Sequence, residues 1–242
     1  MKLHSKFFYV MGLVFMLGGS SLFAAEQSAK EILDKAYAYV GGMDKYAFEA
    51  VVLDDDVQDG KVTREKYRHD VSVKVDRPNK LRVDTKGNVK ERSSILNDGV
   101  FTMIDYGFGY YSQLKTPKSI DAALDSIFEM YGIRAPLAQL VYSDMHQRFK
   151  FNKSKNFGTV MVDGTECHYI AFADVLVEVH IWIATGDKPL VKAYKVIDMQ
   201  EKEHPSISTR ITWDLQATIT DKDFVVALPK DFAPISVLPV EE

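Results

Sequence analysis

Most of this chain alternates between apolar and polar residues with a period of two, which is the pattern of strands in a half-buried antiparallel sheet. Segments 71–75 and 207–213 show this alternation clearly. Short turn sequences separate the alternating segments, and pairs such as Asp98-Gly99 supply the positive φ angles that tight hairpins need. A parallel sheet needs a helix after nearly every strand, so the sequence predicts about ten antiparallel strands joined by hairpins.

A segment with helical periodicity comes before the alternating region. Ser28 and Glu31 fit a capping box, in which each side chain satisfies a backbone N–H group of the other residue. The apolar residues that follow keep helical spacing as far as Gly41-Gly42. We expect this glycine pair to end the helix in a left-handed conformation.

Two further helices are expected in the middle of the chain. The first begins after Pro117 and ends at Gly132. The second is short, covers residues 135–144 and has Pro136 in its first turn. Its expected buried residues are Leu137, Leu140 and Val141.

Together these elements predict an α+β fold with a single, strongly curved antiparallel sheet whose concave face is covered by the helices. No repeat or linker sequence divides residues 26–242, so we expect one domain. The Pro-containing segment 228–242 is expected to be a loosely ordered tail. Gly41-Gly42 and Gly132 are candidate hinges for movement of the helices.

Residues 1–25 have the three parts of a cleaved signal peptide. The start is basic, residues 7–17 are uninterruptedly apolar, and small residues follow up to Ala24 and Ala25. The apolar run is shorter than the roughly 20 residues that span a bilayer. No cysteine lies near the cleavage point to carry a lipid. We therefore expect an exported, soluble protein without a stable membrane anchor.

The charge of the chain bears on its partners. The net charge is −4 for the whole sequence. Binding to nucleic acid depends on a clustered excess of Lys and Arg that neutralises phosphates. We therefore expect no nucleic-acid partner.

Cys167, the only cysteine, is followed directly by His168. A lone cysteine forms no internal disulfide, and successive residues of a strand point to opposite faces, so these two side chains cannot share a metal ion. His180, on the same face of the next strand as Glu178 and Trp182, comes within reach of His168 if the two strands form a hairpin. Zinc usually takes about three or four protein ligands, so two histidines predict no metal site.

Other polar clusters have simple interpretations. Segment 54–56 begins like a calcium-binding loop, but Asp59 stands where that loop needs glycine, so we interpret it as an acidic hairpin. Asp144 and His146 are expected in a polar loop after a helix. No glycine-flanked nucleophile or phosphate-binding loop stands out, so we predict no catalytic residue and no cofactor.

Large, adaptable apolar side chains are abundant, with 14 Phe, 12 Tyr and 9 Met. Most are expected to fill the core, but a curved sheet that helices close can retain an apolar cavity. The candidate residues for lining such a cavity lie on the expected strands and on the middle helix. They are Phe101, Met103, Tyr111, Leu124, Phe128, Tyr131, Trp182 and Trp213.

Several sequence blocks, in this order and spacing, resemble a family of predicted periplasmic proteins of unknown function. They include "VDRPNKLRVD", "ILNDGVFTMID", "VDGTECHYIAF", "VHIWIATGDKPLVKAYKV" and "ITWDL", and the resemblance extends over residues 28–229. That family is similar to the LolA/LolB/LppX group of lipoprotein carriers. The resemblance implies a half-open barrel that carries acyl chains in the better-known relatives, and it implies no catalytic residues.

Three functions agree with these observations. The first is a soluble periplasmic carrier that holds a hydrophobic small molecule or a lipid acyl chain in a cavity between sheet and helices. The second is an interaction module that binds another envelope protein and takes no ligand. The third is a hydrolase or metal-dependent enzyme, which would use His168, His180 and Glu178.

Overall fold

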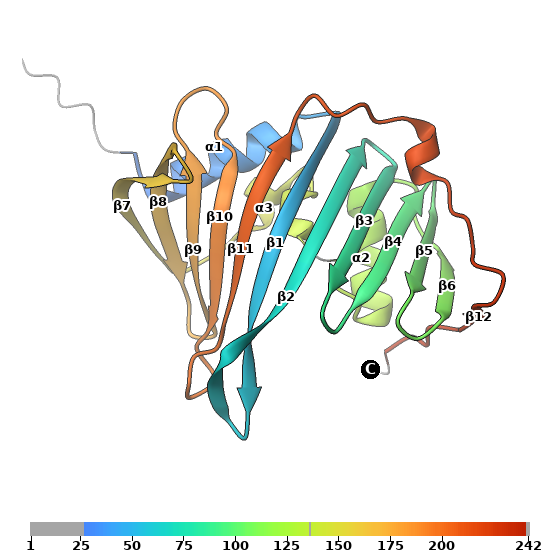
Figure 1. Cartoon of the computed structure of the whole chain (residues 1–242). Helices are drawn as coiled ribbons and strands as arrows, with labels where there is room; N and C mark the ends of the chain where they lie inside the picture. The colour runs from blue at the N-terminus through green and yellow to red at the C-terminus, as the bar shows by residue number, and fades with distance from the viewer. Residues whose placement is uncertain (1–26, 136, 241–242) are drawn as a thin grey trace, which may run out of the picture.

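The computed structural model describes residues 27–135 and 137–240, so the expected signal peptide lies outside the described residues. One long sheet curves around a group of helices (Figure 1). In chain order the elements are α1 (Ala29–Gly41), β1 (Lys45–Gln58), β2 (Lys61–Asp76), β3 (Lys80–Gly87), β4 (Glu91–Asn97), β5 (Val100–Asp105), β6 (Tyr110–Lys115), α2 (Ile120–Tyr131), η1 (Ala138–Leu140), α3 (Met145–Arg148), β7 (Lys153–Val162), β8 (Thr165–Ala173), β9 (Val177–Ala184), β10 (Val191–Asp198), β11 (Ser206–Asp214), η2 (Asp221–Phe224) and β12 (Ala233–Pro234).

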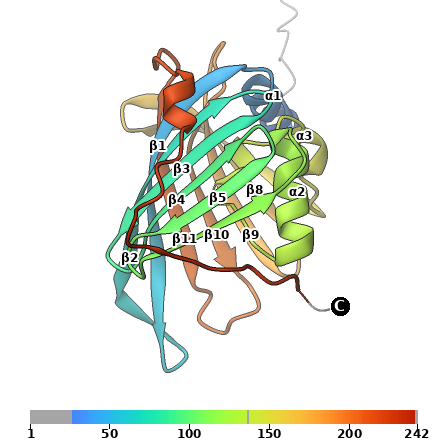
Figure 2. The same cartoon turned by 90° about the vertical axis from the view of Figure 1, so that its right-hand side faces the viewer.

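The sheet has the strand order β12-β6-β5-β4-β3-β2-β1-β11-β10-β9-β8-β7. Every neighbouring pair is antiparallel except β12 and β6, which are parallel. The sheet stays open, and α1, α2 and α3 all lie on its concave side (Figure 2). The predicted fold class is confirmed, but twelve strands form the sheet where about ten were predicted. Two of the strands show no apolar–polar alternation in the sequence, because β7 is exposed along most of its length and β12 has two residues.

The predicted turn chemistry is confirmed at the tight hairpins. Asp98 and Gly99 both have positive φ, at 47° and 87°, and Asp163 and Gly164 repeat the pattern at 47° and 77°. Two consecutive positive φ angles give the turn whose twist matches that of the flanking strands. These Asp-Gly pairs therefore set the register of the hairpins locally.

Helix α1 begins as predicted but ends differently. Glu31 N donates to Ser28 Oγ at 3.2 Å, and Ser28 N donates to Glu31 Oε2 at 2.8 Å, which completes the capping box. Gly42 has a φ of −82°, so the expected left-handed end is wrong. Gly41 is required for a close approach instead, because a Cβ there would lie 2.1 Å from the carbonyl oxygen of Ser143. This packing makes Gly41 a fixed point, which contradicts its interpretation as a hinge.

Helix α2 begins and ends where the sequence predicts. Ser119 caps its start by accepting a hydrogen bond from the N–H of Ala122, and Gly132 ends it with a φ of 65°. The predicted short helix at 135–144 is reduced to the 3-10 turn η1, while its expected apolar residues are buried. Pro136 lies outside the described residues. Helix α3 forms where a polar loop was expected.

The C-terminal tail is hydrogen-bonded along much of its length, which contradicts the expectation of a loosely ordered end. Ala233 N and Ile235 N donate to backbone oxygens of Gly109 and Tyr111, and Val240 N donates to Met130 O at 2.9 Å. The tail thus covers the free edge of β6 and reaches the end of α2 (Figure 2). Covering an edge strand in this way blocks pairing with other chains.

The main core lies between the concave face and the helices. A smaller core lies on the convex face, where Ile219 and Phe224 pack over Ile95. No helix among residues 27–135 and 137–240 is long and apolar enough to cross a membrane.

Candidate functional site

A small cavity lies between α2 and the concave face of the sheet. Its volume is about 50 Å³. Most of its wall is apolar, and its lining residues are Leu81, Val83, Thr85, Lys90, Arg92, Ser94, Phe101, Met103, Leu124, Ile127, Ile133, Arg134 and Ala135. We call this space the inner cavity.

A second, more open pocket of about 280 Å³ lies on the other side of the chain segment that follows α2. Leu124, Ile133, Arg134 and Ala135 line both spaces, so the segment 133–135 is the wall between them. The remaining lining residues of this second pocket are Phe128, Ala138, Gln139 and Tyr142. We call it the outer pocket.

Four of the eight predicted lining residues lie at these spaces. Phe101 and Met103 reach the inner cavity from β5, and Leu124 reaches both spaces from α2. Phe128 lines the outer pocket, where its side chain is 44% exposed and the Arg134 guanidinium lies 5.0 Å from its ring centre.

The other four predicted residues lie elsewhere. Tyr111 is directly opposite Ile104, and Trp182 is directly opposite Tyr169, so both lie on the convex face and their predicted place in the cavity is wrong. Trp213 faces the concave side but is packed against Tyr46 and Phe48, and Tyr131 lines neither space. Trp213 also donates its indole N–H to Val191 O at 2.8 Å, which places it in the packed core.

Polar residues surround one end of the inner cavity. Lys90 and Arg92 line both the inner cavity and a larger pocket of about 690 Å³ beyond it. Arg92 is paired with Asp105 at 2.7 Å, whereas Lys90 has no ion pair among the described residues. Partial burial and the neighbouring Arg92 lower the pKa of Lys90 from its ordinary value. The apolar cavity therefore opens toward a polar, mixed-charge mouth.

His69 and Asp54 belong to the same mouth. His69 Nε2 lies 3.4 Å from Asp54 Oδ2, and its ring packs against Gly87, where a Cβ would lie 2.4 Å from Nδ1. Asp54 itself belongs to strand β1, and the hairpin that follows turns at Asp59-Gly60, in agreement with an acidic hairpin.

The chain segment that closes the site is held firmly at one end. Arg77 Nη2 donates to Val141 O at 2.6 Å and to Tyr46 Oη at 3.2 Å, and its Nε donates to Met43 O at 3.1 Å. This side chain therefore ties the segment after η1 to β1 and to the residues after α1.

A second set of bonds ties the same segment to α2. Asp125 accepts hydrogen bonds from Tyr142 Oη at 3.0 Å and from both terminal nitrogens of Arg148 at 2.7 and 3.0 Å. The bonds from Arg148 are the main cause of the lowered pKa of Asp125. Asp121 accepts from the backbone N–H of Ser143 at 3.1 Å. All these anchors lie at 141–148, and none of these bonds reaches 133–135.

The cysteine and histidines do not form a reactive site. Cys167 and His168 lie in β8 and point to opposite faces, as predicted. His168 is opposite Ile183 on the concave face, whereas His180 lies on the convex face between Tyr169 Oη and Glu178 Oε1, both at 2.7 Å, so the expected approach of the two histidines is wrong. Cys167 is fully buried, and burial raises the pKa of its thiol, which disfavours the reactive thiolate. Across the described residues, no group of three or more His, Cys, Asp or Glu side chains is placed to hold a metal ion.

Sequence analysis missed the residues that join the cavity to its surroundings. Lys90 lies in a hairpin turn, and segment 133–135 follows a helix end, so neither has a periodic signal. Leu81, Val83 and Thr85 were identifiable, because they alternate with polar residues along β3 and are all buried.

Comparisons with known proteins extend this description. Among solved structures, an uncharacterised conserved protein from Thermus thermophilus matches with a TM-score of 0.51 and 12% identity, over 86% of this chain and 99% of that chain. The lipoprotein LppX from Mycobacterium tuberculosis matches at 0.47 and 11%, over 80% and 98%, and a LolA superfamily protein from Nitrosomonas europaea at 0.36 and 9%, over 83% and 98%. At such identities the likeness concerns the fold alone. A comparison with curated proteins found no match.

A family model described as "Predicted periplasmic protein (DUF2092)" matches residues 29–238. This match confirms the family and the periplasmic location that the sequence blocks predicted. Since it spans nearly all of the described residues, the chain belongs to the DUF2092 family of predicted periplasmic proteins.

Proposed function

We propose that this periplasmic protein carries a lipid or another hydrophobic molecule, whose apolar part enters between α2 and the sheet. The strongest support for this proposal is that the inner cavity and the outer pocket are neighbours at α2. Segment 133–135 forms the wall between them. Burial of apolar ligand surface, at roughly 25 cal/mol per Å², supplies the driving force.

The sizes of the two spaces define how binding takes place. The inner cavity, at about 50 Å³, is far smaller than the roughly 300–1,000 Å³ of small-molecule sites. The outer pocket adds about 280 Å³. Binding therefore requires segment 133–135 to move aside so that the two spaces merge. Gly132, in the αL conformation, marks one end of the moving segment. Beyond its other end the chain is held by the buried Leu137 and Leu140, and the Leu140 carbonyl accepts from Tyr46 Oη at 2.8 Å.

The lining also supports binding without chemistry on the ligand. The described residues that line the two spaces include no His, Cys, Asp or Glu. A hydrolase needs a nucleophile with a base within hydrogen-bond reach, and this lining offers no such pair. We therefore propose a carrier that is not an enzyme.

The test combines extraction with a filling variant. We expect protein purified from periplasm without detergent to release lipid on solvent extraction and to take up a fluorescent fatty acid. Ser94 lies on the cavity wall, opposite Met103, so Ser94→Leu is expected to weaken that uptake about tenfold or more by filling the space. Ser154→Leu, the same change at an exposed position of β7, is the matched control and is expected to bind normally.

Two results would contradict the proposal. A protein that releases no lipid and takes up no fatty acid is not a carrier of this kind. Equal uptake by Ser94→Leu and wild type would place the ligand outside the cavity.

An interaction module remains the second candidate, and one surface favours it. Met130 and Val240 are 48% and 53% exposed, and the backbone N–H of Val240 donates to Met130 O, so α2 and the tail place two exposed apolar residues side by side. Such patches often mark protein contacts. A photo-crosslinking residue at Met130 is expected to capture one envelope protein reproducibly if this surface has a partner.

A further inference from the structure

Three aromatic side chains form a ladder across neighbouring strands on the convex face. Phe157 of β7 stacks on Tyr169 of β8, with ring centres 4.6 Å apart and planes at 18°. Tyr169 stacks on Trp182 of β9 at 5.0 Å and 4°. The rings thus follow the spacing of the strands themselves, roughly 4.8 Å.

The ladder is interrupted on the next strand. Ala193 of β10 is directly opposite Trp182, and Arg210 of β11 is directly opposite Ala193. Trp182, Ala193 and Arg210 therefore lie in one row across the convex face, where the backbones of β9 and β11 are about 9 to 10 Å apart. The row has no ring at Ala193, which is the position that a fourth member of the ladder would occupy, and this leaves a gap in the ladder.

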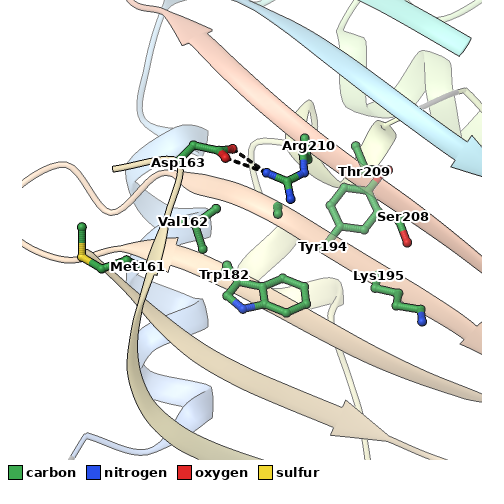
Figure 3. Close-up of a pocket in the computed structure, with 10 residues that line it drawn as sticks. Met161, Val162, Asp163, Trp182, Tyr194, Lys195, Ser208, Thr209 and Arg210 are labelled. Carbon is green, nitrogen blue, oxygen red and sulfur yellow. Dashed lines mark hydrogen bonds and ion pairs between the residues drawn. The ribbon is translucent and has the colours of Figure 1, made fainter. Parts of the chain in front are cut away.

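A pocket fills this gap. Its volume is about 390 Å³, within the range of small-molecule sites, and it is the pocket shown in Figure 3. Asp163, in the β7–β8 turn, accepts two hydrogen bonds at 2.7 Å from Arg210 Nη1 and so holds the guanidinium at the pocket (Figure 3). The planar face of a paired guanidinium stays available for stacking.

The pocket also contains a free positive charge. Lys195 lines it and has no ion pair among the described residues. The one carboxylate among the lining residues, Asp163, is already bonded to Arg210. An acidic substituent on a bound ring would therefore meet Lys195.

We propose that this gap, with Trp182 and Arg210 as its walls and Ala193 as its floor, binds a planar aromatic molecule that carries an acidic group. The ring completes the interrupted ladder between the indole and the guanidinium, and the acid pairs with Lys195. The site lies on the opposite face of the sheet from the inner cavity, so it is independent of the carrier proposal.

The two tryptophans allow a direct test by NMR. We expect naphthalene-2-carboxylate to shift the indole N–H signal of Trp182 in a saturable manner and to leave that of Trp213 unchanged, because Trp213 is bonded to Val191 O in the core. Cyclohexanecarboxylate, an acid of saturated ring, is expected to bind at least tenfold more weakly. Naphthalene-2-carboxamide, the neutral analogue, is expected to bind about fivefold more weakly.

Variants separate the parts of the site. Ala193→Phe places a ring in the gap and is expected to abolish binding, while Ala193→Ser keeps the gap and binds as wild type. Arg210→Gln, at an exposed position, removes one wall and is expected to weaken binding about five- to tenfold without disturbing the fold. An unmoved Trp182 signal at saturating naphthalene-2-carboxylate, or equal affinity in Arg210→Gln and wild type, would overturn the proposal. Fatty-acid uptake is expected to be unchanged in all three variants.

Discussion

The two halves of the concave face are covered by helices of similar length but are packed very differently. Helix α1 lies close against β7, β8 and β9, and its six buried residues are at most 3% exposed. Helix α2 also has four buried residues, at most 5% exposed, but it stands farther from the strands it covers, and its apolar residues Phe128 and Met130 are 44% and 48% exposed. The inner cavity lies under α2.

This difference indicates which half of the molecule can rearrange to admit a ligand. The α1 half is closed by side-chain packing and by the approach of Gly41 to Ser143. The α2 half shares the same core but borders the inner cavity, and polar bonds at 141–148 contribute to holding it. We therefore expect ligand entry at α2, with α1 as the fixed support.

The largest expected effects on stability come from truncating one leucine in each helix, and the two losses can be compared directly. Leu33 of α1 is 1% exposed, so Leu33→Ala leaves a new cavity in closely packed surroundings, and we expect the free energy of unfolding to fall by about 3–4 kcal/mol. Leu124 of α2 already borders a cavity and has fewer neighbours to lose, so we expect about 2 kcal/mol for Leu124→Ala. Urea denaturation measures both. Equal losses would erase the distinction between the two halves.

The half-buried guanidinium of Arg77 joins the two halves, and removing it is the next test of the difference between them. Arg77→Met leaves the oxygens of Met43, Tyr46 and Val141 without their donor, which is expected to cost about 2 kcal/mol. Hydrogen exchange is expected to rise in 141–144 and to stay low in α1. Arg68→Met removes an exposed pair with Asp70 and is the control, for which almost no change in stability is expected. Protection of 141–144 in Arg77→Met would show that the segment is held by other means.

The two glycines at the end of α1 test whether this end is fixed. A Cβ at Gly41 meets the backbone of Ser143, so Gly41→Ala is expected to destabilise by about 1 kcal/mol or more. Gly42 has a helical φ of −82°, which alanine adopts readily, so Gly42→Ala is expected to change the stability by less than about 0.5 kcal/mol. Thermal unfolding distinguishes the two. A neutral Gly41→Ala would mean that the contact with Ser143 yields easily.

The smallest expected effect is a pH dependence confined to the α2 half. Asp125 has a lowered pKa in the folded protein because of its bonds to Arg148, so its contribution is complete above the ordinary Asp value near 4 and is lost as the pH falls below it. Because the Asp125 side chain is 36% exposed, we expect the loss to be below about 1 kcal/mol. Urea midpoints measured from pH 5 down to pH 3 are expected to fall less in Asp125→Asn than in wild type. Identical slopes would remove Asp125 from the attachment of α2.

Local signals explain why much of the fold was predictable. The capping box of α1, the αL glycine after α2 and the Asp-Gly turns all act between residues close in sequence, and the structure has each of them where it was expected. The site was harder to predict. Alternation separates the two faces of a strand, but it does not say which face becomes concave, and Tyr111 and Trp182 were placed on the wrong one.

A missed signal existed for Trp182. Val179, Ile181 and Ile183 are all apolar and occupy one face of β9, while Trp182 shares the other with His180 and Glu178. The fully apolar face is the buried one, so the indole belonged on the convex side. For Tyr111 the neighbouring residues offer no such contrast.

The sequence by itself determined most of the strands, the start of α1 and both ends of α2, because periodicity, capping and turn geometry depend on neighbours a few residues apart. The order of its sequence blocks also determined the family and the periplasmic location. Only the tertiary structure decided the curvature of the sheet, the distance at which each helix packs, and the cross-strand register that leaves Ala193 between Trp182 and Arg210. These features depend on how well side chains from distant segments fill the space between them. The cavity under α2 and the pocket at Ala193 are the spaces that this packing leaves unfilled.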